Sequence, residues 1–141
     1  MWKSRKTTPQ RAGCILLVDL DEEGTGALAE RLAARGIQVF FTAAPHVGRR
    51  LSQEYYFDLV VVDERLDHET SPPLSDVIAR DGHRCVVLSV PPERHAIEAE
   101  AITVRGALRR PLEADRLFEL SVEAARDAST ERLRRLLDLV R

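Results

Sequence analysis

The feature that most constrains the fold is a series of short, uninterrupted apolar runs separated by stretches with helical periodicity. In the clearest run, Leu59-Val60-Val61-Val62, three of the four residues are β-branched, and Asp58 and Asp63 lie on either side. Such a run is too short for a helix and lacks the polar alternation of a strand with one face in water. It therefore indicates a strand that is covered on both faces, at the centre of a sheet.

The remaining runs and periodic stretches alternate along the chain. We expect further strands at 14–18, 37–41, 85–90 and, less regularly, 102–108. We expect helices at about 24–35, 45–54, 74–81, 91–101 and 112–126, with a long polar loop at 64–73. Right-handed crossovers between parallel strands place helices on both faces of the sheet. The sequence thus predicts an α/β fold, a (βα)5 flavodoxin-like doubly wound parallel sheet with strand order 2-1-3-4-5.

Helical periodicity also predicts which side chains face the sheet. In the first helix Ala27, Leu28 and Leu32 share one face, and in the second Val47 and Leu51 are four residues apart. We expect these faces to be buried.

Composition and charge exclude several classes of protein. The chain has 141 residues, enough for one domain, and a formal net charge of −2, which predicts no direct binding of nucleic acid. No segment has the apolar length of a membrane span, and no apolar stretch follows the basic N-terminus as in a secretory signal, so we expect a cytoplasmic protein. Residues 1–13 form a polar, basic segment that we interpret as a flexible arm.

The two cysteines, Cys14 and Cys85, each begin an apolar run and are expected to be buried, reduced thiols. The four histidines are scattered and form no pair with metal-ligand spacing.

Two carboxylates end neighbouring strands of the predicted sheet. Asp19 follows the first strand and Asp63 ends the third. In a sheet of order 2-1-3-4-5, ligands bind beyond the carboxyl ends of strands 1 and 3, where the chain winding reverses. We therefore expect both side chains to meet in that crevice.

Four motifs lie at the ends of the predicted strands, namely Ile-Leu-Leu-Val-Asp at 15–19, Phe-Asp-Leu-Val-Val-Val-Asp at 57–63, Val-Leu-Ser at 87–89 and Arg-Pro at 110–111. With these motifs the sequence resembles, over residues 14–126, the bacterial response-regulator receiver (CheY-like) family. Receivers accept a phosphoryl group on a carboxylate, with Mg²⁺ to neutralise the transferred charge.

The resemblance implies a role for each matching residue. Asp63 matches the phosphoacceptor, Asp19 the first acid of a metal-binding pair, and Ser89 the hydroxyl that contacts the phosphoryl group. Arg110 stands at the position of a lysine that binds phosphoryl oxygens, and Pro111 matches a structural proline that usually follows a cis bond. The implied metal ligands of Mg²⁺ are Asp19 and Asp63.

Several positions depart from the receiver pattern. Leu20 replaces the second acid of the pair, which reduces the expected affinity for Mg²⁺, and Ala107 replaces the aromatic residue that reports the state of the hydroxyl. Asp21 or Glu22 is an alternative metal ligand if the loop after the first strand bulges by one residue. In the next loop, the acids Glu64, Asp67 and Glu69 are expected to be solvated.

The end of the chain, residues 127–141, is expected to form a separate amphipathic helix. Asp127 to Thr130 should break or weaken the preceding helix, with Ser129 or Thr130 as a new cap. Apolar side chains then recur at i, i+3, i+4 and i+7, namely Leu133, Leu136, Leu137 and Val140. This short stripe can pack on its own domain, on a partner or a second copy, or continue toward an effector domain.

These observations leave two main hypotheses for function. The first is a receiver domain of two-component phosphorelay signalling, in which a histidine kinase or phosphotransfer protein phosphorylates Asp63 to regulate an effector protein or domain. The second is a pseudo-receiver, a protein-interaction module that is independent of phosphorylation. Under either hypothesis we expect no enzyme activity beyond self-catalysed gain and loss of a phosphoryl group. A nucleotide-binding enzyme is disfavoured, because no glycine-rich phosphate loop follows the first strand.

Overall fold

Five parallel strands form one sheet in the order β2-β1-β3-β4-β5, so the predicted fold class and strand order are confirmed. The computed structural model describes residues 13–83, 85–93 and 106–140, with the backbone alone for 127–136 and 138–140. The strands are β1 (Gly13–Val18), β2 (Ile37–Thr42), β3 (Leu59–Asp63), β4 (Val86–Val90) and β5 (Gly106–Arg109). The predicted arm and helix at 91–101, and the start of the fifth strand, lie wholly or mostly outside the described residues.

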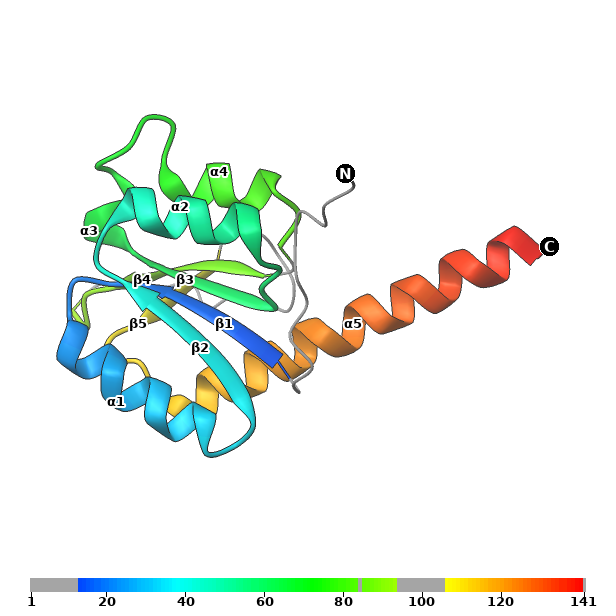
Figure 1. Cartoon of the computed structure of the whole chain (residues 1–141), viewed down its shortest axis with the longest axis horizontal. Coiled ribbons are helices and arrows are strands. Elements are labelled where there is room, and N and C mark those ends of the chain that lie inside the picture. Colours follow the sequence, from blue (N-terminus) through cyan, green and yellow to red (C-terminus); the bar gives the residue numbers. More distant parts are fainter. Residues whose placement is uncertain (1–12, 84, 94–105, 141) are drawn as a thin grey trace.

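The helices cover both faces of this sheet (Figure 1). They are α1 (Glu22–Ala33), α2 (Pro45–Glu54), α3 (Glu64–Asp67), α4 (Leu74–Arg80) and α5 (Ala114–Val140). The helices α1 and α5 lie on one face, and α2, α3 and α4 lie on the other.

The core has two layers because successive side chains of a strand point to opposite faces of the sheet. In β1, Ile15 and Leu17 pack toward α1 and α5, whereas Cys14, Leu16 and Val18 pack toward α2 and α4. All five are buried. This explains why the run is continuously apolar, with no polar residue at any alternate position.

The buried faces of α1 and α2 match the prediction in part. In α1, Leu32 is buried and Leu28 packs against the core, but Ala27 is exposed. In α2, Leu51 packs against the core and Gly48 and Ser52 are buried, whereas Val47 is exposed. Gly48 is buried because α2 approaches Val18 of β1 too closely for a side chain at that position.

Two further segments, residues 64–67 and 127–130, differ from the prediction. Residues 64–67, expected in a loop, form the single-turn helix α3, which buries Leu66. The predicted break at 127–130 is wrong, since α5 continues without interruption to Val140. The division of the chain into a separate C-terminal unit remains a prediction.

Both cysteines are free and buried, as predicted. Burial, with the nearby charge of Asp58, raises the pKa of the Cys14 thiol to about 12, so the thiol stays protonated and unreactive. None of the helices within the described ranges is long and apolar enough to cross a membrane.

Two glycines in helices test how closely the layers pack. A Cβ atom at Gly48 would lie 2.8 Å from Cγ2 of Val18, whereas a Cβ atom at Gly26 would meet no atom within 4 Å. We expect Gly48→Ala to lower the free energy of unfolding by about 1–3 kcal/mol through overpacking. Gly26→Ala should raise it by about 0.5–1 kcal/mol, since alanine is the better helix former. Urea denaturation measures both, and equal effects of the two substitutions would contradict the close packing of α2 on β1.

Candidate functional site

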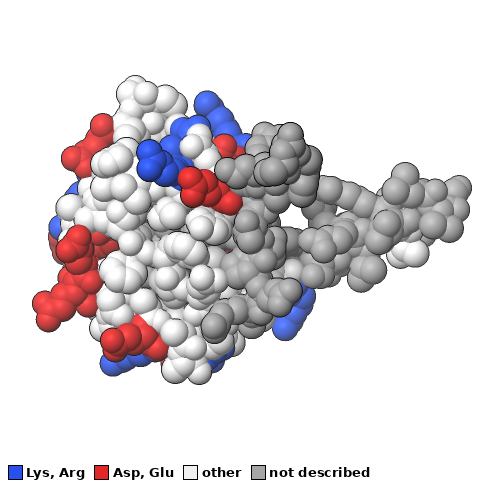
Figure 2. Space-filling view, viewed as in Figure 1, with Lys and Arg blue, Asp and Glu red and all other residues white. Residues whose placement is uncertain are grey.

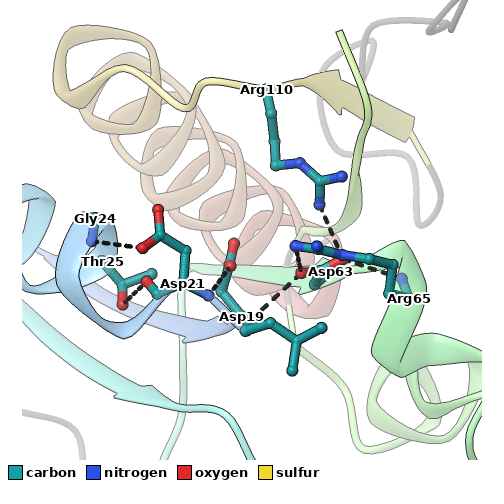
Figure 3. A network of polar contacts seen from close by, with 8 residues as sticks. Asp19, Asp21, Gly24, Thr25, Asp63, Arg65 and Arg110 are labelled. Atoms are coloured by element: carbon teal, nitrogen blue, oxygen red, sulfur yellow. Dashed lines mark hydrogen bonds and ion pairs between the residues drawn. The ribbon is translucent and has the colours of Figure 1, made fainter. Parts of the chain in front are cut away.

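The acidic residues predicted to converge do so at the carboxyl ends of β1 and β3 (Figure 3). Asp63 is the last residue of β3 and is paired in register with Ser89 of β4. Asp19 directly follows β1, and its backbone N–H donates to the Thr42 carbonyl. Asp19 and Asp63 are close enough that the charge of Asp63 raises the pKa of Asp19. Both carboxylates therefore lie at the switch point of the sheet, which we call the crevice after the predicted binding position.

The Asp63 carboxylate is fully buried and both of its oxygens are occupied. Oδ1 accepts from Arg65 Nε at 3.1 Å, from the Arg65 backbone N–H at 3.0 Å and from an Arg110 guanidinium nitrogen at 2.9 Å. Oδ2 accepts from the second Arg65 nitrogen at 2.7 Å and from the Leu20 backbone N–H at 3.4 Å. A buried carboxylate is costly unless it is paired and hydrogen-bonded. Two guanidinium groups meet that requirement here. We call Asp63, Arg65 and Arg110 the arginine clamp.

The geometry of α3 produces the contact with Arg65. Asp63 is the N-cap of α3, so its side chain accepts from the backbone N–H of the second helical residue, which is Arg65. The Arg65 side chain then folds back onto the same carboxylate in bidentate fashion, with about half of its surface exposed. Sequence reasoning missed this role, although an Asp-x-Arg sequence at the start of a helix carries the signal.

The surroundings of the two carboxylates shift their pKa values in opposite directions. Burial alone would raise the pKa of Asp63, but hydrogen bonds from Arg65 and Leu20 and the charge of Arg110 outweigh it, and the pKa falls to about 2. For Asp19, burial dominates and raises the pKa despite the hydrogen bond from the Asp21 N–H. Asp63 is therefore firmly ionised, and Asp19 is the more readily protonated group.

Neither Leu20 nor Asp21 donates an oxygen to the pair of buried carboxylates. The Leu20 side chain is 46% exposed and carries no oxygen. The Asp21 carboxylate accepts from the Gly24 backbone N–H at 2.9 Å and caps α1 (Figure 3). Glu22 is already the first residue of that helix and is exposed.

Of the other predicted site residues, Ser89 is the most informative. Its hydroxyl is fully buried beside Asp63, and within the described part of the chain it has no hydrogen-bond partner. The peptide bond between Arg110 and Pro111 is cis. Ala107 lies on β5, half-buried and paired with Leu88, where an aromatic side chain was expected from the resemblance.

One of the loop acids has a structural role instead of the expected exposure to solvent. Asp67 is buried and accepts from the Ser75 backbone N–H at 2.7 Å, at the start of α4. It therefore stabilises the beginning of α4. Glu69 is exposed.

The residues of the crevice do not fit a divalent cation in this arrangement. Mg²⁺ requires oxygen ligands, and here both oxygens of Asp63 accept from nitrogen donors. Across the described residues, no group of three or more His, Cys, Asp or Glu side chains is placed to hold a metal ion. The arginine clamp already supplies two positive charges where a cation would bind.

Comparison with solved structures supports the fold, but comparison of the sequence identifies no family. No family model matches the chain, and no curated protein matches it. Among solved structures, the receiver domain of the hybrid histidine kinase CckA is 21% identical with a TM-score of 0.62, and the match covers 79% of this chain and 98% of that one. The N-terminal domain of a response regulator/sensory box/GGDEF protein from Carboxydothermus hydrogenoformans is 17% identical with a TM-score of 0.62, over 84% and 98% of the two chains.

A third match is the receiver domain of the Francisella response regulator 1452, at 14% identity and a TM-score of 0.61, over 82% and 98% of the two chains. At these identities the likeness is one of fold. The chain has the CheY-like receiver fold, as the sequence motifs indicated.

The depressed pKa of Asp63 predicts how stability depends on pH. The pKa of Asp63 is lower in the folded state than its ordinary value of 3.8. Ionised Asp63 therefore stabilises the folded protein above pH 3.8, and this stabilisation is lost as the pH falls toward 2. The loss amounts to about 2 kcal/mol. Asp19 acts with the opposite sign, since its raised pKa means that protonation favours the folded state.

We expect Asp63→Asn to be less stable than the wild type at neutral pH, because the amide leaves two arginines without a counter-charge. The difference should narrow as the pH falls from 4 to 2, because protonation of Asp63 in the unfolded chain removes the stabilisation of the wild type. The folded-state carboxylate, with a pKa of about 2, is itself half protonated only at the end of this range. Denaturation curves at several pH values measure this, with Asp115→Asn, at an exposed carboxylate, as the control. A difference that stays constant over this range would contradict the arginine clamp.

Proposed function

We propose that this chain is a receiver-fold signalling module that acts through protein–protein interaction and does not depend on phosphorylation. The observation that carries the proposal is the arginine clamp, in which Arg65 and Arg110 engage both oxygens of Asp63. In this role the clamp holds the crevice in one state. Signals would pass through contacts with a partner or effector.

The chemistry of the clamp supports this reading. A carboxylate that attacks phosphorus needs a free oxygen and a counter-charge for the incoming phosphoryl group. In Asp63 both oxygens accept charge-assisted hydrogen bonds, which lowers their nucleophilicity. Leu20 offers no carboxylate that could draw a cation into the crevice.

A phosphoacceptor function is the second candidate, and one observation favours it. The buried Ser89 hydroxyl lies next to Asp63, and no partner satisfies it within the described residues. A phosphoryl oxygen on Asp63 would be such a partner, and Arg110 would supply a positive charge beside it. Since Arg65 is half-exposed, its side chain can swing out to open the carboxylate. A histidine kinase or phosphotransfer protein would then be the donor.

A phosphorylation assay separates the two candidates. Wild type and Asp63→Asn are incubated with acetyl phosphate and Mg²⁺, and intact mass spectrometry at neutral pH detects an added phosphoryl group. We expect no mass shift on either protein, since the clamp blocks the nucleophile. An acid-labile adduct on the wild type alone would reject the proposed function in favour of the phosphoacceptor.

Metal binding provides an independent test of the clamp. We expect the double variant Leu20→Asp/Arg65→Ala to bind Mg²⁺ on the order of tenfold more tightly than the wild type, a difference of about 1.4 kcal/mol. One substitution adds an oxygen ligand and the other removes a competing cation. Isothermal titration calorimetry measures the affinity, and adding Asp63→Asn to the double variant should abolish the gain. Equal binding by wild type and double variant would contradict the placement of Leu20 and Arg65 around the cation position.

A further inference from the structure

A groove of about 500 Å³ runs between α1 and β2, away from the arginine clamp. Small residues of α1, namely Gly26, Ala29 and Ala33, form one wall, and Val39 and Phe41 of β2 form the other. Because β2 is an edge strand, no further strand of the described sheet covers this side. Phe41 is 44% exposed. Figure 2 shows a largely uncharged surface over this side of the molecule, with acidic and some basic side chains along its margin.

Gly26 indicates that the groove is open for a reason other than packing within the domain. A glycine inside a helix costs about 1 kcal/mol relative to alanine. That cost is usually offset by close packing, but a Cβ atom at Gly26 would meet no atom within 4 Å. The free space beside Gly26 is therefore available to another molecule.

The charges around the groove select for a basic ligand. Positions 22, 26, 29, 30 and 33 lie along one stripe of a helix that turns 100° per residue, so Glu22 and Glu30 share the stripe of the groove. Arg31, the basic residue of α1, lies on the opposite side of the helix by the same periodicity. Arg35, which follows α1, binds Asp115 of α5 at 2.7 Å and stacks over Phe118. An apolar helix with basic edges would match this surface.

The C-terminal part of α5 has this character. On a regular helix its apolar positions 133, 136, 137 and 140 lie about 180° around the axis from Leu117, Leu120 and Ala124, which pack in the core. Leu137 is 61% exposed. Figure 1 shows α5 extending well beyond the sheet. A continuous helix cannot turn this stripe back onto its own domain.

The charged positions of this segment discriminate between possible partners. By the same periodicity, Arg132 and Arg134 flank the apolar stripe at about 100° on either side, whereas Glu131, Arg135 and Asp138 lie nearly opposite to it. Two such stripes packed against each other would bring arginines together. The α1–β2 groove instead offers Glu22 and Glu30.

We propose that the α1–β2 groove binds the C-terminal segment of α5 from a second copy of this chain. The apolar stripe packs against the groove wall, and Arg132 and Arg134 pair with the acidic residues Glu22 and Glu30 beside it. Reciprocal exchange of the two segments gives a closed dimer, the symmetric solution that most homo-oligomers adopt. The mode is that of an amphipathic helix in an apolar groove. This dimer rests on the interaction function proposed above, for which it supplies a partner. It does not depend on whether Asp63 is phosphorylated.

The test measures molecular mass by sedimentation velocity over a range of protein concentrations. We expect a dimer for the wild type and a shift toward monomer, by at least tenfold in the dissociation constant, for Gly26→Lys and for Leu137→Gln. Gly26→Lys fills the groove with a positive charge and replaces glycine by a better helix former, so the fold is retained. The matched control is Ala27→Lys, which places the same charge on the exposed side of the same helix.

A charge exchange tests the pairing itself. Glu30→Arg and Arg134→Glu should each weaken the dimer, and the two together should restore part of the affinity. A wild type that stays monomeric at every concentration would overturn the proposal. So would a dimer that Leu137→Gln disrupts while Gly26→Lys leaves it intact, since that result indicates helix–helix pairing without the groove. Because this test measures the oligomeric state, a failure of the dimer proposal is distinct from any outcome of the phosphorylation assay.

Discussion

The carboxylate of Asp63, buried at the end of the central strand, is the constraint on which the site depends. A parallel sheet covered on both faces excludes water from its strand ends near the core, so a charge placed there must be neutralised by the protein. Arg65 comes from the turn that follows β3, and Arg110 from the end of β5. The same carboxylate caps α3. One ionised group thus connects the central strand, the following helix and the far edge of the sheet.

This arrangement separates the receiver fold from receiver chemistry. The switch-point crevice retains its acids, a buried hydroxyl at Ser89 and a cation at Arg110. Arg65 places a second positive charge on Asp63 from within the chain, and the exposed Leu20 side chain carries no oxygen. Under the proposed function, such a fold keeps acids and a hydroxyl at its switch point and holds them in one ionic state. This agrees with the general observation that function resides in sites and not in folds.

In a module that acts through protein contacts, as proposed here, the exposed surfaces determine function. The two glycines of α1 and α2 illustrate the contrast between inner and outer surfaces. Gly48 is required because α2 lies against Val18, whereas Gly26 faces open space beside the edge strand. The side chains of Phe41 and, near the end of α5, Leu137 are exposed and lie outside the core that stabilises the domain. Surfaces of this kind are typical of protein–protein contacts.

The sequence by itself determined the sheet, its strand order and the meeting of Asp19 with Asp63, because continuous apolar runs require cover on both faces and parallel strands end at one edge. Only the tertiary structure decided the partners of Asp63. Arg65 contacts Asp63 because the N-cap residue of a helix lies next to the second helical residue. Apolar periodicity in the sequence does not predict this contact. The face of α2 and the continuity of α5 were likewise decided by packing distance and helix propagation. Local sequence signals specify neither of these.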